Sequence, residues 1–258
     1  MPADNLTRGA GRLYFDRFLD GTTTKTGRRY VGHTPSLNIA IESDTLDHIN
    51  KDNGVGETDK TATLSTSRDG SFTTDNISPP NVAMFYLGSA DVFTQAATPV
   101  VDEVHTVKQD HFYQLGAAQG SGMGVRNVAS VDVQDDTDIT TYVDGVDYTV
   151  DLVMGMVYII TTANGGSIVD GDVLHIDYTP AAETRSQMLS GAMSVKGELF
   201  FESTNPDGDK IDYLYPSVEL SPEGEHELKS DEWQEMNFKI SIGKLNTTTQ
   251  AIISQGRA

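Results

Sequence analysis

Alternating apolar and polar positions organise the N-terminal part of the chain from Ser36 onward. In residues 36–42, Leu37, Ile39 and Ile41 alternate with smaller or polar residues, which predicts a strand with one side facing a core. A polar stretch, residues 43–59, comes next, and the Thr-rich residues 60–67 predict a returning strand. Because hairpin loops usually have about two to five residues, we expect so long a loop to be either functional or disordered.

The returning strand carries a hydroxyl group at every second position, and alternation predicts that these side chains share one side of the strand. A hydroxylated, uncharged side suits a wetted wall or a subunit contact better than a hydrophobic core. The residues concerned are Thr61, Thr63, Ser65 and Ser67.

A short helix is predicted after this strand. Ser78 is a suitable N-cap, Pro79 fits the first helical position and Gly88 is a typical C-terminal stop. Val82, Phe85 and Tyr86 are spaced i, i+3 and i+4, so they fall on one face that can lie on a sheet.

The C-terminal part has the clearest alternation in the chain. Residues 236–242 predict a strand with apolar side chains facing inward (Met236, Phe238, Ile240 and Ile242) and polar ones facing outward (Asn237, Lys239 and Ser241). Residues 193–201 predict a further strand, and its return strand begins at Ile211. Pro216 lacks a backbone N–H, so we expect the return strand to lie at an edge or to end there.

The middle of the chain predicts seven short strands separated by turns such as Asp144-Gly145 and Asp170-Gly171. This spacing is typical of a small β-sandwich or barrel. The predicted strands are residues 103–109, 112–115, 125–133, 140–143, 148–153, 156–161 and 173–179.

The charge distribution marks the middle segment as a separate unit. The formal net charge is −20, and residues 98–182 contain 13 acidic but only 2 basic residues, a net charge of −11. We therefore predict a discontinuous core domain (residues 1–97 and 183–258) and an inserted small β domain (residues 98–182). A chain this acidic is a poor binder of nucleic acid, because that binding depends on Lys and Arg neutralising phosphates.

The order of elements resembles the major tail tube proteins of tailed phages. The resemblance lies in the strand at 36–42, the long acidic and polar loop, the Thr/Ser-rich strand at 60–67, the short aromatic helix at 79–88 and the C-terminal strands. It implies a siphophage-type, mainly β fold: a tail-tube-type β-sandwich or barrel core with one short helix, plus the inserted β-sandwich domain. It also implies that subunits form hexameric rings, and that the rings stack into the conduit for genome delivery.

The same resemblance implies the partners and the contact surfaces. The partners would be other copies of the chain and the tape measure, tail terminator and baseplate proteins, with double-stranded DNA passing through unbound and no membrane involved. The loop is expected to contact a neighbouring subunit or ring through Asp44, Asp47, Asn50, Lys51, Asp52, Asn53, Glu57 and Asp59. Strands facing the lumen, or joining the sheets of a ring, would carry Thr61, Thr63, Ser65, Ser67, Asn237, Lys239 and Ser241. The protein is expected in the virion tail, after assembly in the host cytoplasm.

Catalytic and metal chemistry is not predicted, and no cofactor is expected. The glycine-rich residues 120–124 lack a dinucleotide or phosphate-loop pattern, so they are read as a flexible loop. None of the six histidines has the helical spacing of a zinc protease. His175 and Asp177 share a strand face and could hold a metal in principle, but a surface histidine beside an aspartate is the preferred interpretation. Asn205, Asp207 and Asp209 fit an ordinary hairpin turn better than a calcium loop.

Three alternatives to a phage tail tube stay open. A tube protein of a contractile injection or type VI secretion system would have the same core fold. A surface adhesin built from β-modules should carry a secretion signal, and the N-terminal residues lack the apolar segment of one. A β-sandwich glycan enzyme would need a pair of carboxylates, but the adjacent acidic residues, such as Asp135-Asp136, fit solvated loops.

Overall fold

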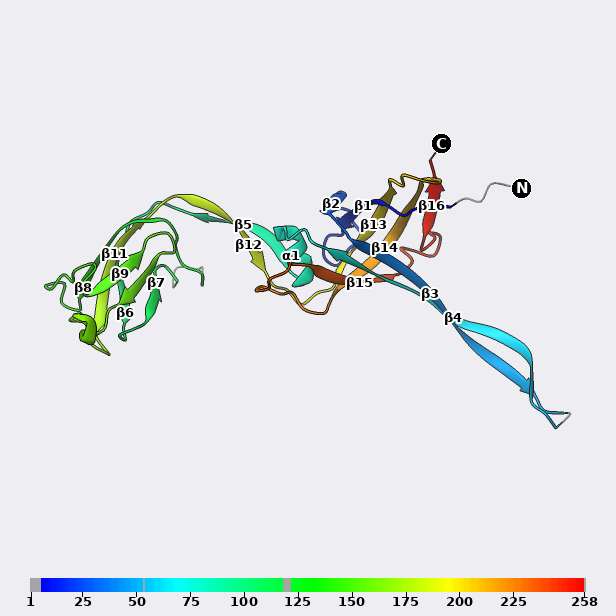
Figure 1. Ribbon diagram of the computed structural model, residues 1–258, viewed down its shortest axis with the longest axis horizontal. Helices are drawn as coiled ribbons and strands as arrows, with labels where there is room; N and C mark the ends of the chain where they lie inside the picture. Colours follow the sequence, from blue (N-terminus) through cyan, green and yellow to red (C-terminus); the bar gives the residue numbers. More distant parts are fainter. Residues whose placement is uncertain (1–5, 53, 118–121, 258) are drawn as a thin grey trace. The chain divides into compact units, whose positions relative to one another are not determined.

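The computed structural model describes residues 6–52, 54–117 and 122–257, and its strands and single α-helix make the protein mainly β (Figure 1). The predicted fold class is therefore confirmed at this level. The chain divides into two compact units. Unit 1 is formed by residues 1–91 and 187–258, and unit 2 by residues 92–186.

Unit 1 is built on one antiparallel sheet with the order β2-β1-β13-β14-β15-β4-β3, and β16 pairs with β14 in addition. The C-terminal strands β13, β14 and β15 thus lie between two pairs of N-terminal strands in a single sheet. Its strands are β1 (Gly11–Arg17), β2 (Arg29–Gly32), β3 (Ser36–Asn50), β4 (Glu57–Thr74), β13 (Val195–Ser203), β14 (Ile211–Glu223), β15 (Met236–Ile242) and β16 (Ile253–Gly256).

The helix α1 (Pro79–Phe85) begins where the sequence predicts and packs on the core of this sheet. Phe85 meets Phe238 edge-on at 5.9 Å between ring centroids, and Phe72 stacks on Phe238 at 4.9 Å. The predicted face is confirmed, because Val82 and Tyr86 also pack against the core. Ser78 precedes the helix but makes no side-chain cap hydrogen bond. Gly88 is needed for close approach, since a Cβ there would lie 1.8 Å from the Leu189 carbonyl oxygen.

The prediction of a loop over residues 43–59 is wrong, because only the residues between Asn50 and Glu57 connect the two strands. β3 extends to Asn50 and β4 starts at Glu57, and the two strands pair from Ser36↔Thr73 out to Asn50↔Glu57. The polar composition hid the strands because neither face of this part is buried. Alternation of apolar and polar residues reports a half-buried strand, so a fully exposed one lacks that signal.

Pro216 does not end its strand or place it at an edge, which is the second correction. β14 continues through it between β13 and β15. The proline is tolerated because β16 pairs only with residues 211–214 and β15 only with residues 218–223. On the other side the register shifts between Gly197 and Leu199. No backbone hydrogen bond is therefore required of Pro216, as expected for a proline at a bulge.

Unit 2 contains two three-stranded sheets around one hydrophobic core. The sheet orders are β6-β11-β8 and β7-β10-β9, and the core residues include Leu115, Val133, Val157, Leu174 and Ile176. The strands are β6 (Val100–Thr106), β7 (Phe112–Gln114), β8 (Val128–Asp135), β9 (Tyr148–Asp151), β10 (Met156–Ile159) and β11 (Val173–Pro180), with a 3₁₀ turn at Thr162–Asn164.

Six of the seven strands predicted in the middle of the chain are present, with shifted ends. The exception is 140–143, where Thr141 makes only an isolated bridge to Gln134. Strands β5 (Ser89–Gln95) and β12 (Glu183–Leu189) pair as a two-stranded sheet, and the chain passes between the units within them. In the part of the chain that the structure describes, no helix is long and apolar enough to span a membrane.

Asp212 ties β14 to the C-terminal residues of unit 1. It accepts hydrogen bonds from Arg257 Nη2 at 2.6 Å and Nε at 2.8 Å, and from the Ser203 N–H at 2.8 Å. The Arg257 bonds, helped by the Ser203 N–H, lower the pKa of Asp212 even though burial raises it.

We predict that Asp212→Asn lowers the free energy of unfolding by about 1 kcal/mol at neutral pH, because it removes charge-assisted bonds from a partly exposed site. A carboxyl whose pKa is lowered on folding stabilises the protein above its unfolded pKa of about 3.9, and this stabilisation disappears as the pH falls through the lowered value. Urea denaturation over a pH series should therefore show the wild type and the variant converging in acid. Asp207→Asn, in an exposed turn, is the control, and a pH-independent difference would contradict the assignment.

Candidate functional site

The outer part of the β3–β4 hairpin extends beyond the sheet of unit 1 (Figure 1). β15 pairs with β4 only from Asp69 to Thr74, so residues 41–68 are paired only within the hairpin. β3 is the last strand of the sheet along its whole length. This outer part, which we call the free hairpin (residues 41–68), therefore has an unpaired backbone edge on both sides. A two-stranded hairpin by itself is at best marginally stable in water.

Two register shifts interrupt the alternation of side chains along β4, whereas β3 has no extra residue. Between Asp44 and Thr45 the partner changes from Ser65 to Thr63, so Leu64 is an extra residue. Directly opposed residues share a face and consecutive residues alternate. Thr61 and Thr63 therefore lie on the opposite face from Ser65 and Ser67. The prediction that all four hydroxyl groups share one side is wrong, because a bulge interrupts the period of two.

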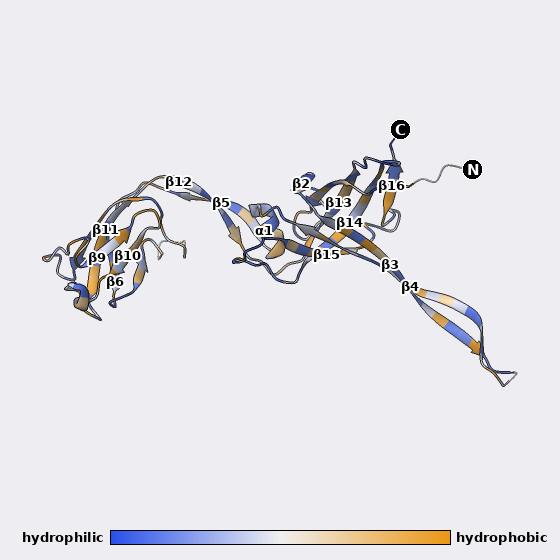
Figure 2. Ribbon diagram, viewed as in Figure 1, coloured by the Kyte–Doolittle hydropathy of each residue, from blue (hydrophilic) through white to orange (hydrophobic). Residues whose placement is uncertain are grey.

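Hydrophobic residues occur at intervals along the free hairpin (Figure 2), and the pairing register places their side chains on both faces. Ile41 and Ile49 fall on one face and Leu46 on the other, and they are 59%, 52% and 60% exposed. Val55 and Leu64 are 71% and 61% exposed. Single exposed apolar residues need no explanation, but a series of them on an unsupported hairpin is typical of a surface that is covered by a partner.

The predicted contact residues all lie on this hairpin. Asp44, Asp47 and Asn50 are on β3, Glu57 and Asp59 are on β4, and Lys51 and Asp52 lie between the strands, whereas Asn53 is outside the described residues. All of those described are exposed. Some are paired within the hairpin: Asp59 with His48 Nδ1 at 2.5 Å, and Asp47 with the Thr61 hydroxyl at 2.6 Å.

Asn237, Lys239 and Ser241 point away from the core, as predicted, since their neighbours Met236, Phe238, Ile240 and Ile242 are buried. They belong to a polar face that crosses four strands in register. The rows are Glu223–Asn237–Thr73–Ser36, Ser221–Lys239–Ser71–Asn38 and Glu219–Ser241–Asp69–Ala40. Thr73 links two of these strands, because its hydroxyl donates to Asn237 Oδ1 at 2.6 Å and accepts from Ser36 at 3.1 Å.

The opposite end of the sheet is basic. Arg12, Arg17, Lys25, Arg28 and Arg29 lie on or beside β1 and β2. Glu198, with a side chain only 3% exposed, pairs with Lys25 and receives two bonds from Arg28, at 2.8 and 3.0 Å. Arg28 also stacks over Phe200 at 4.3 Å. These contacts fix the loop between β1 and β2.

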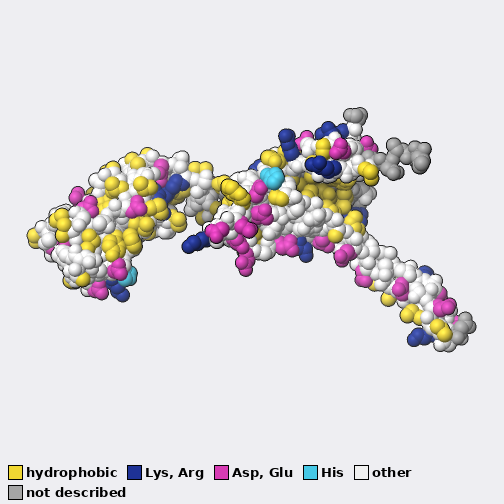
Figure 3. All heavy atoms as spheres, in the orientation of Figure 1, with side chains coloured by type: hydrophobic (Ala, Val, Ile, Leu, Met, Phe, Trp, Pro, Cys, Tyr) yellow, Lys and Arg dark blue, Asp and Glu magenta, His cyan; other side chains and the backbone are white. Residues whose placement is uncertain are grey.

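Acidic side chains gather in the loop that precedes β15 (Figure 3). Trp233, the single tryptophan of the chain, is in this loop and is 94% exposed. The acidic residues of the loop are Glu225, Glu227, Asp231, Glu232 and Glu235; Glu223 ends β14 just before it, and Lys229 is a basic residue in the same loop. An indole ring beside carboxylates is suited to bind cationic side chains, by cation–π and charge attraction together.

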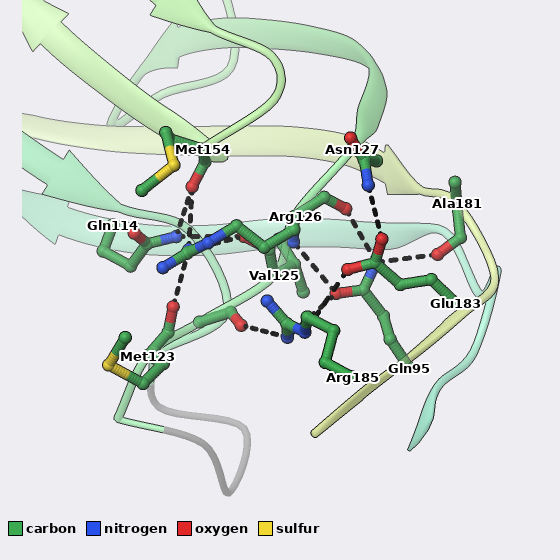
Figure 4. Close-up of polar contacts among 11 residues, drawn as sticks. Gln95, Gln114, Met123, Val125, Arg126, Asn127, Met154, Ala181, Glu183 and Arg185 are labelled. Carbon is green, nitrogen blue, oxygen red and sulfur yellow. Dashed lines mark hydrogen bonds and ion pairs between the residues drawn. The ribbon is translucent and has the colours of Figure 1, made fainter. Parts of the chain in front are cut away.

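In unit 2, a polar network holds the ends of β5 and β12 to residues 123–127 (Figure 4). Gln95 is 5% exposed. Its Nε2 donates to the carbonyl oxygens of Arg126 and Ala181, both at 2.7 Å, and its Oε1 accepts from the Arg126 N–H at 2.9 Å. One buried amide thereby joins β5, the end of β11 and the loop before β8.

Arg126 and Arg185 complete this network (Figure 4). The Arg126 guanidinium donates to the carbonyl oxygens of Met123, Val125 and Met154 at 2.7 to 3.0 Å. Arg185 on β12 donates to the Gly124 carbonyl at 3.1 Å and lies over the Phe93 ring at 5.0 Å. Glu183 pairs with Arg185 Nε at 3.3 Å and accepts from Asn127. Of the glycine-rich residues 120–124, Gly120 and Ser121 lie outside the described residues, but Gly124 is buried and bonded.

His175 is not paired with Asp177, the neighbour that the sequence suggested. Its Nδ1 lies 2.6 Å from Asp102 Oδ1 and 3.0 Å from Asp138 Oδ1. Asp177 instead accepts the Asp102 N–H at 2.7 Å. The two carboxylates are 73 and 37 positions from His175 in sequence, so no local motif could have identified them.

A protein family described as protein of unknown function UCP028589 matches residues 6–255, which is nearly the whole chain. No curated protein matches the chain.

We predict that Gln95→Ala lowers the free energy of unfolding by about 1–3 kcal/mol, because it removes three hydrogen bonds and leaves two partly buried carbonyl groups and one N–H without this partner. Residues 123–127 and the ends of β5 and β12 should exchange their amide hydrogens faster, as measured by mass spectrometry. Thr94→Ala, at the adjacent exposed position, is the matched control. Equal exchange in both variants would show that the amide does not hold these segments together.

Proposed function

The chain belongs to this family of unknown function, and we propose that it is a structural protein whose copies assemble into stacked rings that form the tail tube of a phage. The observation that carries the proposal is the free hairpin. It exposes apolar side chains on both faces and leaves both backbone edges unpaired, although it is built from well-paired strands. Such edges invite pairing with another chain unless something covers them.

The two ends of the unit 1 sheet have complementary charge. Residues 11–32, at the end with β1 and β2, contain five Lys and Arg residues and two Asp residues, whereas the free hairpin contains six acidic residues and three basic ones. Three of the five basic residues already form ion pairs, Arg17 with Asp20 and both Lys25 and Arg28 with Glu198. Contacts between two different surfaces of one subunit are heterologous, and they close into rings or extend into filaments. Charge complementarity of this kind fixes the register of an interface and speeds encounter.

The polar sheet face supports a role as a conduit wall. It presents Ser, Thr and Asn side chains, three acidic residues and a single lysine, in rows that run across β14, β15, β4 and β3. Duplex DNA carries about one negative charge per 1.7 Å, so a wall rich in Lys and Arg would retain it. A hydroxylated wall allows DNA to pass without specific binding. In this proposal the chain has a structural and not a catalytic role.

The assembly partners follow from the same proposal. Copies of the chain would form hexameric rings, with tape measure, terminator and baseplate proteins inside or at the ends of the tube. The protein would be found in the virion tail after assembly in the host cytoplasm. Unit 2, with its own core and its own sheets, would be carried as an additional domain that does not form part of the wall.

We predict that replacing residues 44–65 by Asn-Gly abolishes tube formation and leaves the subunit folded. The change joins Ser43 to Thr66, which are directly paired, through a turn suited to a two-residue hairpin. Negative-stain microscopy and light scattering at high concentration should show tubes for the wild type only, and circular dichroism should show retained β-structure in the variant.

Point variants give a graded version of this test. Ile49→Asp or Leu46→Asp should raise the concentration needed for assembly about 10- to 100-fold, because burial of one such side chain contributes about 1.5–3 kcal/mol. Ile139→Asp, at a residue of unit 2 that is 83% exposed, is the matched control. A wild type that stays monomeric, or a shortened hairpin that still forms tubes, would overturn the proposal.

A further inference from the structure

Three potential metal ligands from separate segments of unit 2 converge on one point. Asp102 is on β6, Asp138 is in the turn after β8 and His175 is on β11. One ligand atom of each, namely a carboxylate oxygen from each aspartate and a nitrogen of His175, lies within 4.8 Å of the other two. The sheet order β6-β11-β8 explains the convergence. β11, which carries His175, is the central strand, with β6 and Asp102 on one side and β8, followed by the turn with Asp138, on the other.

Hydrogen bonding within the trio does not satisfy its members. His175 Nδ1 lies 2.6 Å from one carboxylate and 3.0 Å from the other, but a ring nitrogen carries at most one hydrogen. Two acceptors therefore compete for a single donor. Among the described residues, His175 is the only ion-pair partner of either carboxylate.

The surroundings supply little other positive charge. Residues 98–182 contain 13 acidic residues, and their only Lys and Arg residues are Lys108 and Arg126. Arg126 is bonded to the carbonyl oxygens of Met123, Val125 and Met154. Asp102 and Asp138 thus share one imidazole within an acidic unit, and a cation from solution is best suited to neutralise their charge.

We propose that Asp102, Asp138 and His175 bind one divalent transition-metal ion of the zinc type. Imidazole nitrogen and carboxylate oxygen are both ordinary zinc ligands at about 2.0–2.2 Å, and three protein ligands leave a position for water. In tetrahedral geometry the ligand atoms lie about 3.4 Å apart, so the separations of 2.6 and 3.0 Å between His175 Nδ1 and the two carboxylates need to lengthen by less than about 1 Å. Ca²⁺ prefers six to eight oxygen ligands and fits this set poorly.

The ion would join three segments of unit 2 that are separate in the sequence. Asp138 is placed by its N–H bond to the Asp135 carbonyl at 3.1 Å, and Asp102 by its N–H bond to the Asp177 carboxylate at 2.7 Å. Bridging all three ligands ties the β8 turn and β6 to the central strand β11. The site would thus stabilise unit 2, and it does not depend on the assembly proposed for unit 1.

The test is a calorimetric titration of the chelator-treated, dialysed full chain with ZnCl₂ and, separately, with CaCl₂. We expect saturable binding of about one Zn²⁺ per chain, weak or no binding of Ca²⁺, and a higher thermal unfolding temperature with Zn²⁺. Asp138→Asn and His175→Ala should each weaken Zn²⁺ binding by at least about tenfold. Asp138 is 60% exposed in a turn, so its variant tests the site with little risk to folding, which circular dichroism verifies.

His48→Ala is the matched control, because His48 pairs with a single aspartate, Asp59, at 2.5 Å. This variant should bind Zn²⁺ like the wild type. Absence of saturable Zn²⁺ binding to the wild type would overturn the proposal. So would equal binding by the Asp138→Asn, His175→Ala and His48→Ala proteins, since the ion would then be held elsewhere.

Discussion

The pairing of β4 with β15 ends at Asp69, and the free hairpin depends on where this pairing stops. From Asp69 to Thr74, β4 is an inner strand, held by β15 on one side and β3 on the other, with Phe72 in the core. Beyond Asp69 the same two strands continue without a sheet and without a core. The inner part fixes the register at the base, and the register shifts twice further out, between Asp44 and Thr45 and between His48 and Ile49. The hairpin is therefore anchored at its base by the packing of Phe72 and Phe238, while its outer surface stays available.

Unit 2 is attached to its two connecting strands by a different kind of interaction. Gln95, Arg126 and Arg185 bond mainly to backbone carbonyl groups, so the network fixes the course of the chain and not a particular side-chain partner. Because the Gln95 side chain is buried, water cannot readily replace its hydrogen bonds, and the loss of one bond would leave a polar atom of its amide without that partner. The network keeps the entering and leaving strands together at the base of a domain with its own core.

Much of unit 1 could be predicted from the sequence, and each failure has its own physical cause. The strand at 236–242 and the helix at Pro79 can be predicted because one face of each is buried. A buried face makes apolar residues recur with the period of the strand or the helix. The strands within residues 43–59 have no buried face. Their sequence is therefore polar and lacks the apolar alternation that predicts a strand. Pro216 wrongly predicted a strand end or an edge strand. A proline is accepted at this position because of the way β13, β15 and β16 pair around it, which the sequence does not show. The change in composition placed the middle domain at 98–182, and the compact unit spans 92–186. The cluster of Asp102, Asp138 and His175 could not be predicted from the sequence, because only the order of strands in the sheet brings its members together.

The positions of the apolar residues along β3 have a consequence for how copies of this chain could meet. Both register shifts of the hairpin place their extra residue on β4, so the side chains of β3 alternate without interruption. Leu46 therefore faces one way, and Ile41 and Ile49 face the other. A single flat surface cannot bury both faces of a two-stranded ribbon. Burial of both faces requires either a groove that encloses the free hairpin or two neighbours on opposite sides. In the stacked rings proposed above, a subunit would have neighbours both within its own ring and in the next, so both faces could be buried.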